Sequence, residues 1–226
     1  MKPSIINRIA KASAGLAILP FCYGFTTQLA RTATSVAYKQ HAPYHFLLGF
    51  AAYLVIHLLF RRPILTYVFG HELTHALFAL MFGGSVKSFH ASERGGRVTI
   101  TKSNFVITLA PYFFPIYTFI AITAYIAADA AGVKGADPWL VAIAGATYAF
   151  HLLLTFSFLR ADQDDIREHG AAFSYPLIYL FNIVFLALLM RLLVAKNMDF
   201  FAYLRDAIIA SIEIVCRTIG LAKGLL

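Results

Sequence analysis

Residues 64–82 read ILTYVFGHELTHALFALMF, and His71-Glu72-Leu73-Thr74-His75 at its centre matches the pattern H-E-x-x-H. The flanking residues are apolar, so the pattern lies inside a hydrophobic segment that we expect to be helical. Residues four positions apart project from the same face of a helix. His71 and His75 can therefore offer two imidazoles to one metal ion, with Glu72 beside them as a general base.

The composition of the whole chain is that of a membrane protein. Hydrophobic residues make up 60% and charged residues 13% of the 226 residues, and the mean hydropathy is +0.71. A soluble domain carries roughly 25% charged residues. The net charge of +8 could suggest a nucleic-acid partner. However, the basic residues are scattered among the loops between apolar runs, which favours contact with lipid headgroups and no nucleic acid.

Apolar runs along the chain predict an all-α polytopic fold with about six transmembrane helices. The expected spans are residues 12–30, 44–60, 64–82, 105–128, 139–160 and 172–194. We expect the first to be a retained span or signal anchor. Residues 200–221 keep apolar side chains at helical spacing among charged ones, which is typical of an amphipathic interfacial helix.

A short segment after the H-E-x-x-H helix has a different character. Gly83-Gly84 and Gly95-Gly96 each lead into a short alternating stretch, which predicts a small β-hairpin-like element. Its edge could pair with an unwound substrate segment by strand addition. The alternative is an ordinary polar connector.

A catalytic zinc site needs a third protein ligand besides the two histidines, with the fourth position left to water. The candidates are in the acidic cluster Asp162-Gln163-Asp164-Asp165, at the end of the fifth expected span. Taken alone, this cluster is typical of a solvated interfacial loop.

These features together resemble the site-2 protease family of intramembrane zinc metalloproteases, over roughly residues 64–195. The resemblance rests on the H-E-x-x-H pattern in a span, the glycine-rich segment, further spans and a distant aspartate motif. It implies that His71, His75 and one aspartate hold Zn²⁺ and that Glu72 activates water. The sequence around Asp165 is similar to the variant motifs of divergent bacterial members, which favours Asp165 as third ligand over Asp162 and Asp164. No soluble stretch between spans is long enough for a PDZ domain, so we expect a member without one.

The positions of the two motifs along their spans create a geometric requirement. Simple alternation of six spans would put Asp165 near the membrane surface opposite to His71. A broken or re-entrant segment, a strongly tilted helix or a miscounted span is therefore needed. Pro111 and Pro115 mark the expected place for a break.

We therefore expect N-terminal spans in residues 1–63, a metalloprotease-like core in 64–195 and the interfacial helix in 196–226. The predicted function is zinc-dependent endopeptidase activity on membrane-spanning substrates, by metal-activated water. The expected partners are a membrane-protein or membrane-peptide substrate and the lipid bilayer, in a multi-pass protein of the bacterial inner (plasma) membrane. A non-proteolytic metal-binding scaffold and a small transporter are the alternatives.

Overall fold

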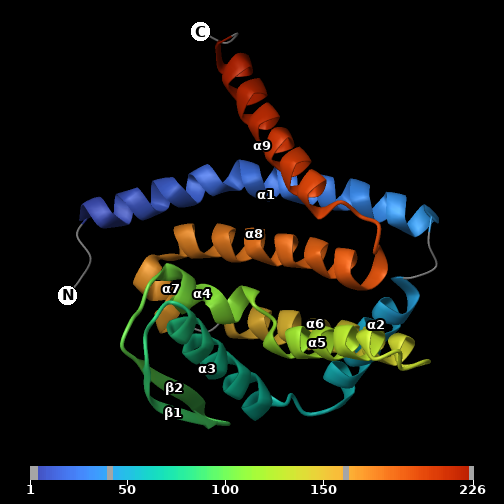
Figure 1. Cartoon of the computed structure of the whole chain (residues 1–226). Coiled ribbons are helices and arrows are strands. Elements are labelled where there is room, and N and C mark those ends of the chain that lie inside the picture. Colours follow the sequence, from blue (N-terminus) through green and yellow to red (C-terminus); the bar gives the residue numbers. More distant parts are fainter. Residues whose placement is uncertain (1–4, 40–42, 160–162, 224–226) are drawn as a thin grey trace. The chain divides into compact units, whose positions relative to one another are not determined.

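The computed structural model describes residues 5–39, 43–159 and 163–223 of the chain. Helices account for most of these residues, and the strands form a single two-stranded hairpin (Figure 1). The elements are, in chain order, α1 (Ile5–Lys39), α2 (Pro43–Leu59), α3 (Ile64–Met81), β1 (Val86–Ser92), β2 (Gly95–Ile100), α4 (Phe105–Phe113), α5 (Ile116–Ala130), α6 (Asp137–Leu159), α7 (Asp164–His169), α8 (Ala171–Leu189), the π-helical turn η1 (Met190–Val194) and α9 (Phe200–Lys223).

The helices fit a membrane protein by length and composition. Among the described residues, four are long and apolar enough to cross a bilayer: Ile5–Ser35, Ile64–Met81, Asp137–Leu159 and Ala171–Val194. The pair α4 and α5 would make a fifth span if it is counted as one. The second expected span corresponds to a shorter apolar helix, Tyr44–Leu59. The predicted all-α polytopic class is therefore confirmed. The four long helices, the bent pair and the shorter helix together roughly match the six expected spans.

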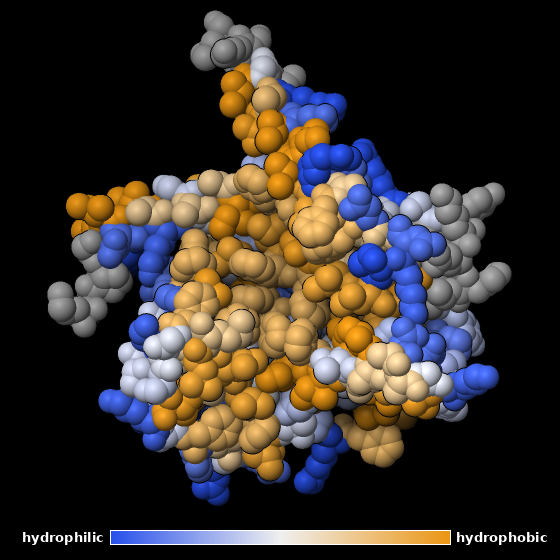
Figure 2. Space-filling view, viewed as in Figure 1, coloured by the Kyte–Doolittle hydropathy of each residue, from blue (hydrophilic) through white to orange (hydrophobic). Residues whose placement is uncertain are grey.

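Large hydrophobic side chains are exposed along these helices, as lipid-facing surfaces require. Figure 2 shows hydrophobic residues over much of the visible face, while hydrophilic residues gather mainly toward its margins. Trp139, Leu58 and Phe201 are among the most exposed of these side chains. Such a surface would be an aggregation hazard in water but is the expected exterior of a protein in a bilayer.

The predicted break lies where the two prolines stand. Helix α4 ends at Phe113, α5 begins at Ile116, and the two helix axes are bent by 70°. Pro115 immediately precedes α5 and has no N–H to donate, so the hydrogen bond that would continue α4 through this point is missing, which favours a break here. The expectation of a broken or re-entrant segment at Pro111 and Pro115 is confirmed.

The hairpin is also where the glycine pairs predict it. Strands β1 and β2 are antiparallel, from the pair Val86 and Ile100 to the pair Ser92 and Gly95, with an irregularity between Val86 and Ser88. Gly83 and Gly95 have positive φ angles of 72° and 134°, which side chains other than glycine rarely adopt. The glycines therefore permit the turns that begin and reverse this element.

The contacts between elements divide the chain into two units, residues 42–165 and residues 1–41 with 166–226. In the first unit α2 packs closely on α6, because a Cβ added at Gly49 would lie 1.8 Å from the carbonyl oxygen of Ala142. In the second unit α1 packs on α8 and α9, and Gly24 lies against Ser211 of α9. Small residues at helix contacts are typical of membrane helices, which approach by van der Waals packing. The division into residues 1–63, 64–195 and 196–226 is a different, functional division and stays a prediction.

Candidate metal centre

Helix α3 places the two histidines of the H-E-x-x-H pattern on one face. His71 and His75 lie one turn apart, and their rings meet edge to face with centroids 4.9 Å apart. The two Nε2 atoms are 3.2 Å apart. His75 is buried and His71 is partly buried. The helix therefore brings two imidazole nitrogens to one point inside the unit formed by residues 42–165.

Asp165 reaches the same point from α7. Its Oδ2 atom lies 3.4 Å from Nε2 of His71 and 3.4 Å from Nε2 of His75. Within the described ranges, these three residues form the one group of three His, Cys, Asp or Glu side chains whose donor atoms could share a metal ion. Asp164 is described but is not part of this group, and Asp162 lies outside the described residues.

Residues from α4 hold two of these side chains in place. The Nδ1–H of His75 donates to the backbone carbonyl of Ile107 at 2.9 Å, which leaves Nε2 with a free lone pair. The hydroxyl of Tyr112 donates to Oδ2 of Asp165, also at 2.9 Å. Asn104 caps α4 by accepting hydrogen bonds from the backbone N–H groups of Val106 and Ile107. One short helix thus supports a ligand candidate from α3 and another from α7.

The surroundings of Asp165 favour its ionised form. Burial acts to raise the pKa of this carboxyl, but the hydrogen bonds and charges of His71 and His75 outweigh burial. Its pKa therefore lies well below the ordinary value. A carboxylate that is ionised at neutral pH is the state that a metal ligand requires.

The side chain of Glu72 extends from α3 toward the hairpin. Only 7% of its surface is exposed, and its carboxylate lies near the backbone N–H of Val98 on β2. A Cβ added at Gly96 would lie 2.5 Å from Cγ and 2.6 Å from Oε1 of Glu72. The hairpin therefore fits against Glu72 because position 96 has no side chain.

A cavity of about 240 Å³ adjoins His71 and Glu72. The hairpin contributes Arg94, Gly95 and Gly96 to its wall, while Phe158 and Gln163 close it from α6 and the segment after it. A pocket lined by both a possible base, Glu72, and a possible metal ligand, His71, has the composition of a candidate active site.

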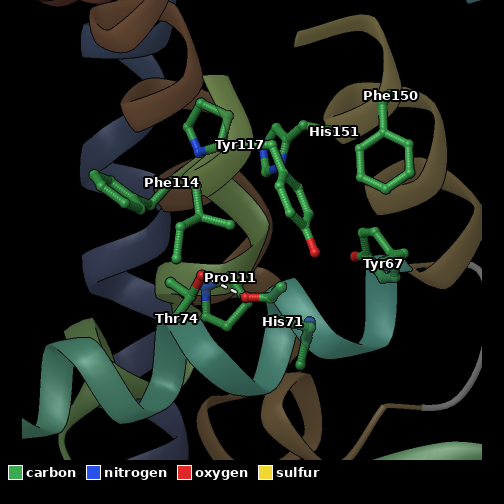
Figure 3. Close-up of a pocket in the computed structure, with 11 residues that line it drawn as sticks. Tyr67, His71, Thr74, Pro111, Phe114, Tyr117, Phe150 and His151 are labelled. Carbon is green, nitrogen blue, oxygen red and sulfur yellow. Dashed lines mark hydrogen bonds between the residues drawn. The ribbon is translucent and has the colours of Figure 1, made fainter. Parts of the chain in front are cut away.

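The adjoining face of α3, which also includes His71, is closely packed. Figure 3 shows the Tyr117 ring reaching from α5 toward α3, with Phe150 and His151 of α6 beside it. The Tyr117 hydroxyl donates to the carbonyl of Thr66 at 2.6 Å, and its ring occupies the place that a Cβ at Gly70 would take. The remaining cavity measures about 20 Å³, which is room for a single water. This packing fixes the position of α3, the helix that carries the two histidines.

The donor set fits a zinc ion in both chemistry and spacing. Two imidazoles and one carboxylate are a common set of protein ligands for catalytic zinc. In a tetrahedral site with bonds of roughly 2.0–2.1 Å, neighbouring ligand atoms lie about 3.3 Å apart. The three donor atoms here are separated by 3.2, 3.4 and 3.4 Å. This triangle has the size of one face of such a tetrahedron.

A comparison of the sequence with models of protein families gives information on the function of this site. The family model described as peptidase M50B-like matches residues 44–161, which include the H-E-x-x-H helix, the hairpin and α4 to α6. The chain belongs to this peptidase family. Comparisons with curated proteins and with solved structures found no significant match.

Family membership confirms the predicted relation to the site-2 proteases. It supports a protease, and with the apolar helices it supports an integral membrane protein. The members of this family are zinc metalloproteases. The matched segment ends just before Asp165, so the place of Asp165 in the site rests on the geometry alone.

Sequence reasoning brought together His71, Glu72, His75 and Asp165, but it missed the residues that support them. The Tyr112 hydroxyl donates to Asp165, the Ile107 carbonyl accepts from His75, and Gly96 lies against Glu72. A signal for Tyr112 was available, because its hydroxyl lies in an apolar segment where a polar group needs a partner. A backbone carbonyl such as that of Ile107 has no sequence signal of its own.

Proposed function

We propose that this protein is a zinc-dependent intramembrane endopeptidase in which His71, His75 and Asp165 hold the ion and Glu72 is the general base. The observation that carries the proposal is the triangle of two Nε2 atoms and one Oδ2 atom with edges of 3.2–3.4 Å. Membership of a peptidase family supports the reaction class. The family model does not identify the metal ligands, and the choice of His71, His75 and Asp165 is supported by their geometry.

The chemistry divides between the ion and the side chains. A zinc ion in this site would polarise the scissile carbonyl and lower the pKa of a water molecule toward 7. Glu72 accepts a proton from the attacking water and passes it to the leaving amine as the C–N bond breaks. Its burial beside His71, at the wall of the 240 Å³ cavity, supports this role because bulk water does not compete there.

The substrate that we propose is a membrane-spanning segment that has locally unwound. A helix keeps its carbonyls in intrahelical hydrogen bonds, so an intact one cannot present a peptide bond for attack. The hairpin supplies backbone edges at the cavity: Gly95 and Gly96 line it, and the N–H of Val98 points at Glu72. An extended substrate segment could add to such an edge, which favours strand addition over a role as mere connector.

The proposed setting is the bacterial inner (plasma) membrane, with the bilayer and its proteins as partners. Four spans and a bent pair support a multi-pass protein. The bacterial assignment rests on the similarity of the segment around Asp165 to divergent bacterial motifs.

The zinc content of detergent-purified protein tests the metal site. We expect about one zinc per chain in the wild type and its loss in both His75→Ala and Asp165→Ala. Loss in His75→Ala alone would move the third ligand away from Asp165. No zinc in the wild type, after reconstitution with the metal, would overturn the proposal.

A cleavage assay tests the role of Glu72 separately. Glu72→Gln keeps the volume of the side chain but cannot accept the proton, so we expect cleavage of a membrane-protein substrate to be abolished while zinc remains bound. Retained proteolysis in this variant, with its zinc content unchanged, would contradict the proposed mechanism.

A further inference from the structure

A second, larger cavity lies in the unit formed by residues 1–41 and 166–226, and the metal centre has no part in it. Its volume is about 750 Å³, and it lies between the first turns of α1 and the junction of α7 with α8. The two helices meet at Gly15, where an added Cβ would lie 1.9 Å from the carbonyl oxygen of Ala172. Figure 1 shows the first turns of α1 extending beyond the start of α8.

The cavity lies at the membrane surface, because α1 and α8 start on the same side of the bilayer. Their contacts advance together along both helices: Cys22 donates to the carbonyl of Pro176, and Thr26 hydrogen-bonds Tyr179. The helices are therefore parallel. Both are among the helices long and apolar enough to span a membrane, so their first turns lie at the level of the lipid headgroups.

The wall of the cavity combines positive charge with apolar surface. Glu168 is its one carboxylate, against three cations. The side chains that matter are the cations Arg8, Lys11 and Arg167 and the apolar residues Ile5, Ile9, Ala12 and Phe173.

One of the cations is held in place by the protein. Lys11 Nζ donates to the backbone carbonyl of Glu168 at 3.0 Å and lies 3.1 Å from Nδ1 of His169. Arg8 is exposed, and it has no ion pair within the part of the chain that the structure describes. A fixed ammonium and an arginine without a carboxylate partner leave a positive potential that an anion can neutralise.

We propose that this cavity binds the phosphate headgroup of an anionic phospholipid. Arg8, Lys11 and Arg167 contact the phosphate, and one acyl chain lies along Ile5, Ile9 and Phe173. Basic pockets between membrane helices at the headgroup level bind anionic lipids, because cations near the surface attract them and the apolar wall takes the chain. The apolar wall favours a lipid over free phosphate, because only a lipid has an acyl chain that can pack against it.

Lipid titration of the full-length protein in detergent micelles, read by native mass spectrometry, tests this proposal. The probes are phosphatidylglycerol, phosphatidylcholine with the same acyl chains, and inorganic phosphate. We expect one phosphatidylglycerol per chain, bound roughly tenfold or more tightly than phosphatidylcholine. The double variant Arg8→Gln with Arg167→Gln should lose this preference, and Arg8→Lys with Arg167→Lys should restore most of it.

A matched control is Arg205→Gln with Arg217→Gln, which removes the same charge from α9 of the same unit. This control should keep the preference for phosphatidylglycerol. Equal binding of both lipids by the wild type, or an equal loss in the control, would overturn the proposal. Displacement of the lipid by millimolar inorganic phosphate would also overturn it, by identifying the site as one for free phosphate. The zinc content of all variants should stay at the wild-type value, since these residues lie outside the metal centre.

Discussion

At the scale of single residues, Gly96 is as important to the candidate site as the residues with chemistry. Any side chain at this position would meet Glu72 and also Cγ1 of Val68, at 2.7 Å. Gly96→Ala should therefore displace the Glu72 carboxylate and lower the rate of substrate cleavage by roughly tenfold or more, since small misplacements of a catalytic group are costly. The zinc content should be unchanged, because neither histidine is touched.

A control for this substitution is available on α9. Gly220→Ala adds the same methyl group where nothing lies within 4 Å, so its cleavage rate should equal that of the wild type. A Gly96→Ala variant with the wild-type rate would mean that the position of Glu72 against β2 does not matter for the reaction.

A second prediction at this scale concerns Tyr112. Its hydroxyl is the hydrogen-bond donor that orients Oδ2 of Asp165, and such partners of metal ligands typically change affinity by 10- to 100-fold. Tyr112→Phe should weaken zinc binding by roughly that factor, measured by competition with a chelator of known affinity. Tyr117→Phe loses a hydrogen bond of the same kind, to the Thr66 carbonyl, and should keep the wild-type affinity. An equal loss in both variants would point to general destabilisation instead of support of the metal ligand.

At the scale of elements, α4 is the part of the chain on which the site geometry depends. It contains both Ile107 and Tyr112, and Asn104 caps its first turn with two hydrogen bonds. Asn104→Ala should lower the free energy of unfolding by about 1 kcal/mol, the usual value of such a cap. Denaturant unfolding in detergent measures it, with Asn104→Asp as the variant that keeps an acceptor oxygen. If Asn104→Asp were as destabilising as Asn104→Ala, the cap would not be the reason.

The elements also show which parts of the structure could be predicted from local sequence. The helix around His71, the hairpin after Gly83 and the break at Pro115 each depend on residues that are neighbours in the chain, and all three are where the sequence predicts them. The first span was expected at residues 12–30, but the helix runs from Ile5 to Lys39. Its polar ends continue the helix beyond the apolar run that the hydropathy pattern detects.

Tertiary contacts could not be predicted in the same way. His75 and the Ile107 carbonyl are 32 residues apart, and Tyr112 and Asp165 are 53 residues apart. No local period relates such positions. Asp165 could be proposed only because a zinc site needs a third ligand, and choosing it from three neighbouring aspartates required a family resemblance. The distances in the folded chain now support that choice on independent grounds.

At the scale of the whole molecule, a bound metal ion would join parts that are otherwise held by weaker contacts. The three proposed ligands come from α3 and α7, and His75 and Asp165 are 90 positions apart in the chain. A ligand that binds only the folded state stabilises it, by about 2.7 kcal/mol when its free concentration is 100 times the dissociation constant. Removing zinc from the wild type with a chelator should therefore lower the unfolding temperature by several degrees.

The same measurement on variants separates metal binding from catalysis. Glu72→Gln should show the full zinc-dependent shift of the unfolding temperature, because Glu72 is not among the proposed ligands. Asp165→Asn and His75→Ala should show little or none, since each lacks one corner of the donor triangle. A full shift in Asp165→Asn would place the stabilising ion elsewhere in the molecule. A shift in the wild type that disappears in both ligand variants would tie the stability of this unit to the three atoms that lie 3.2–3.4 Å apart.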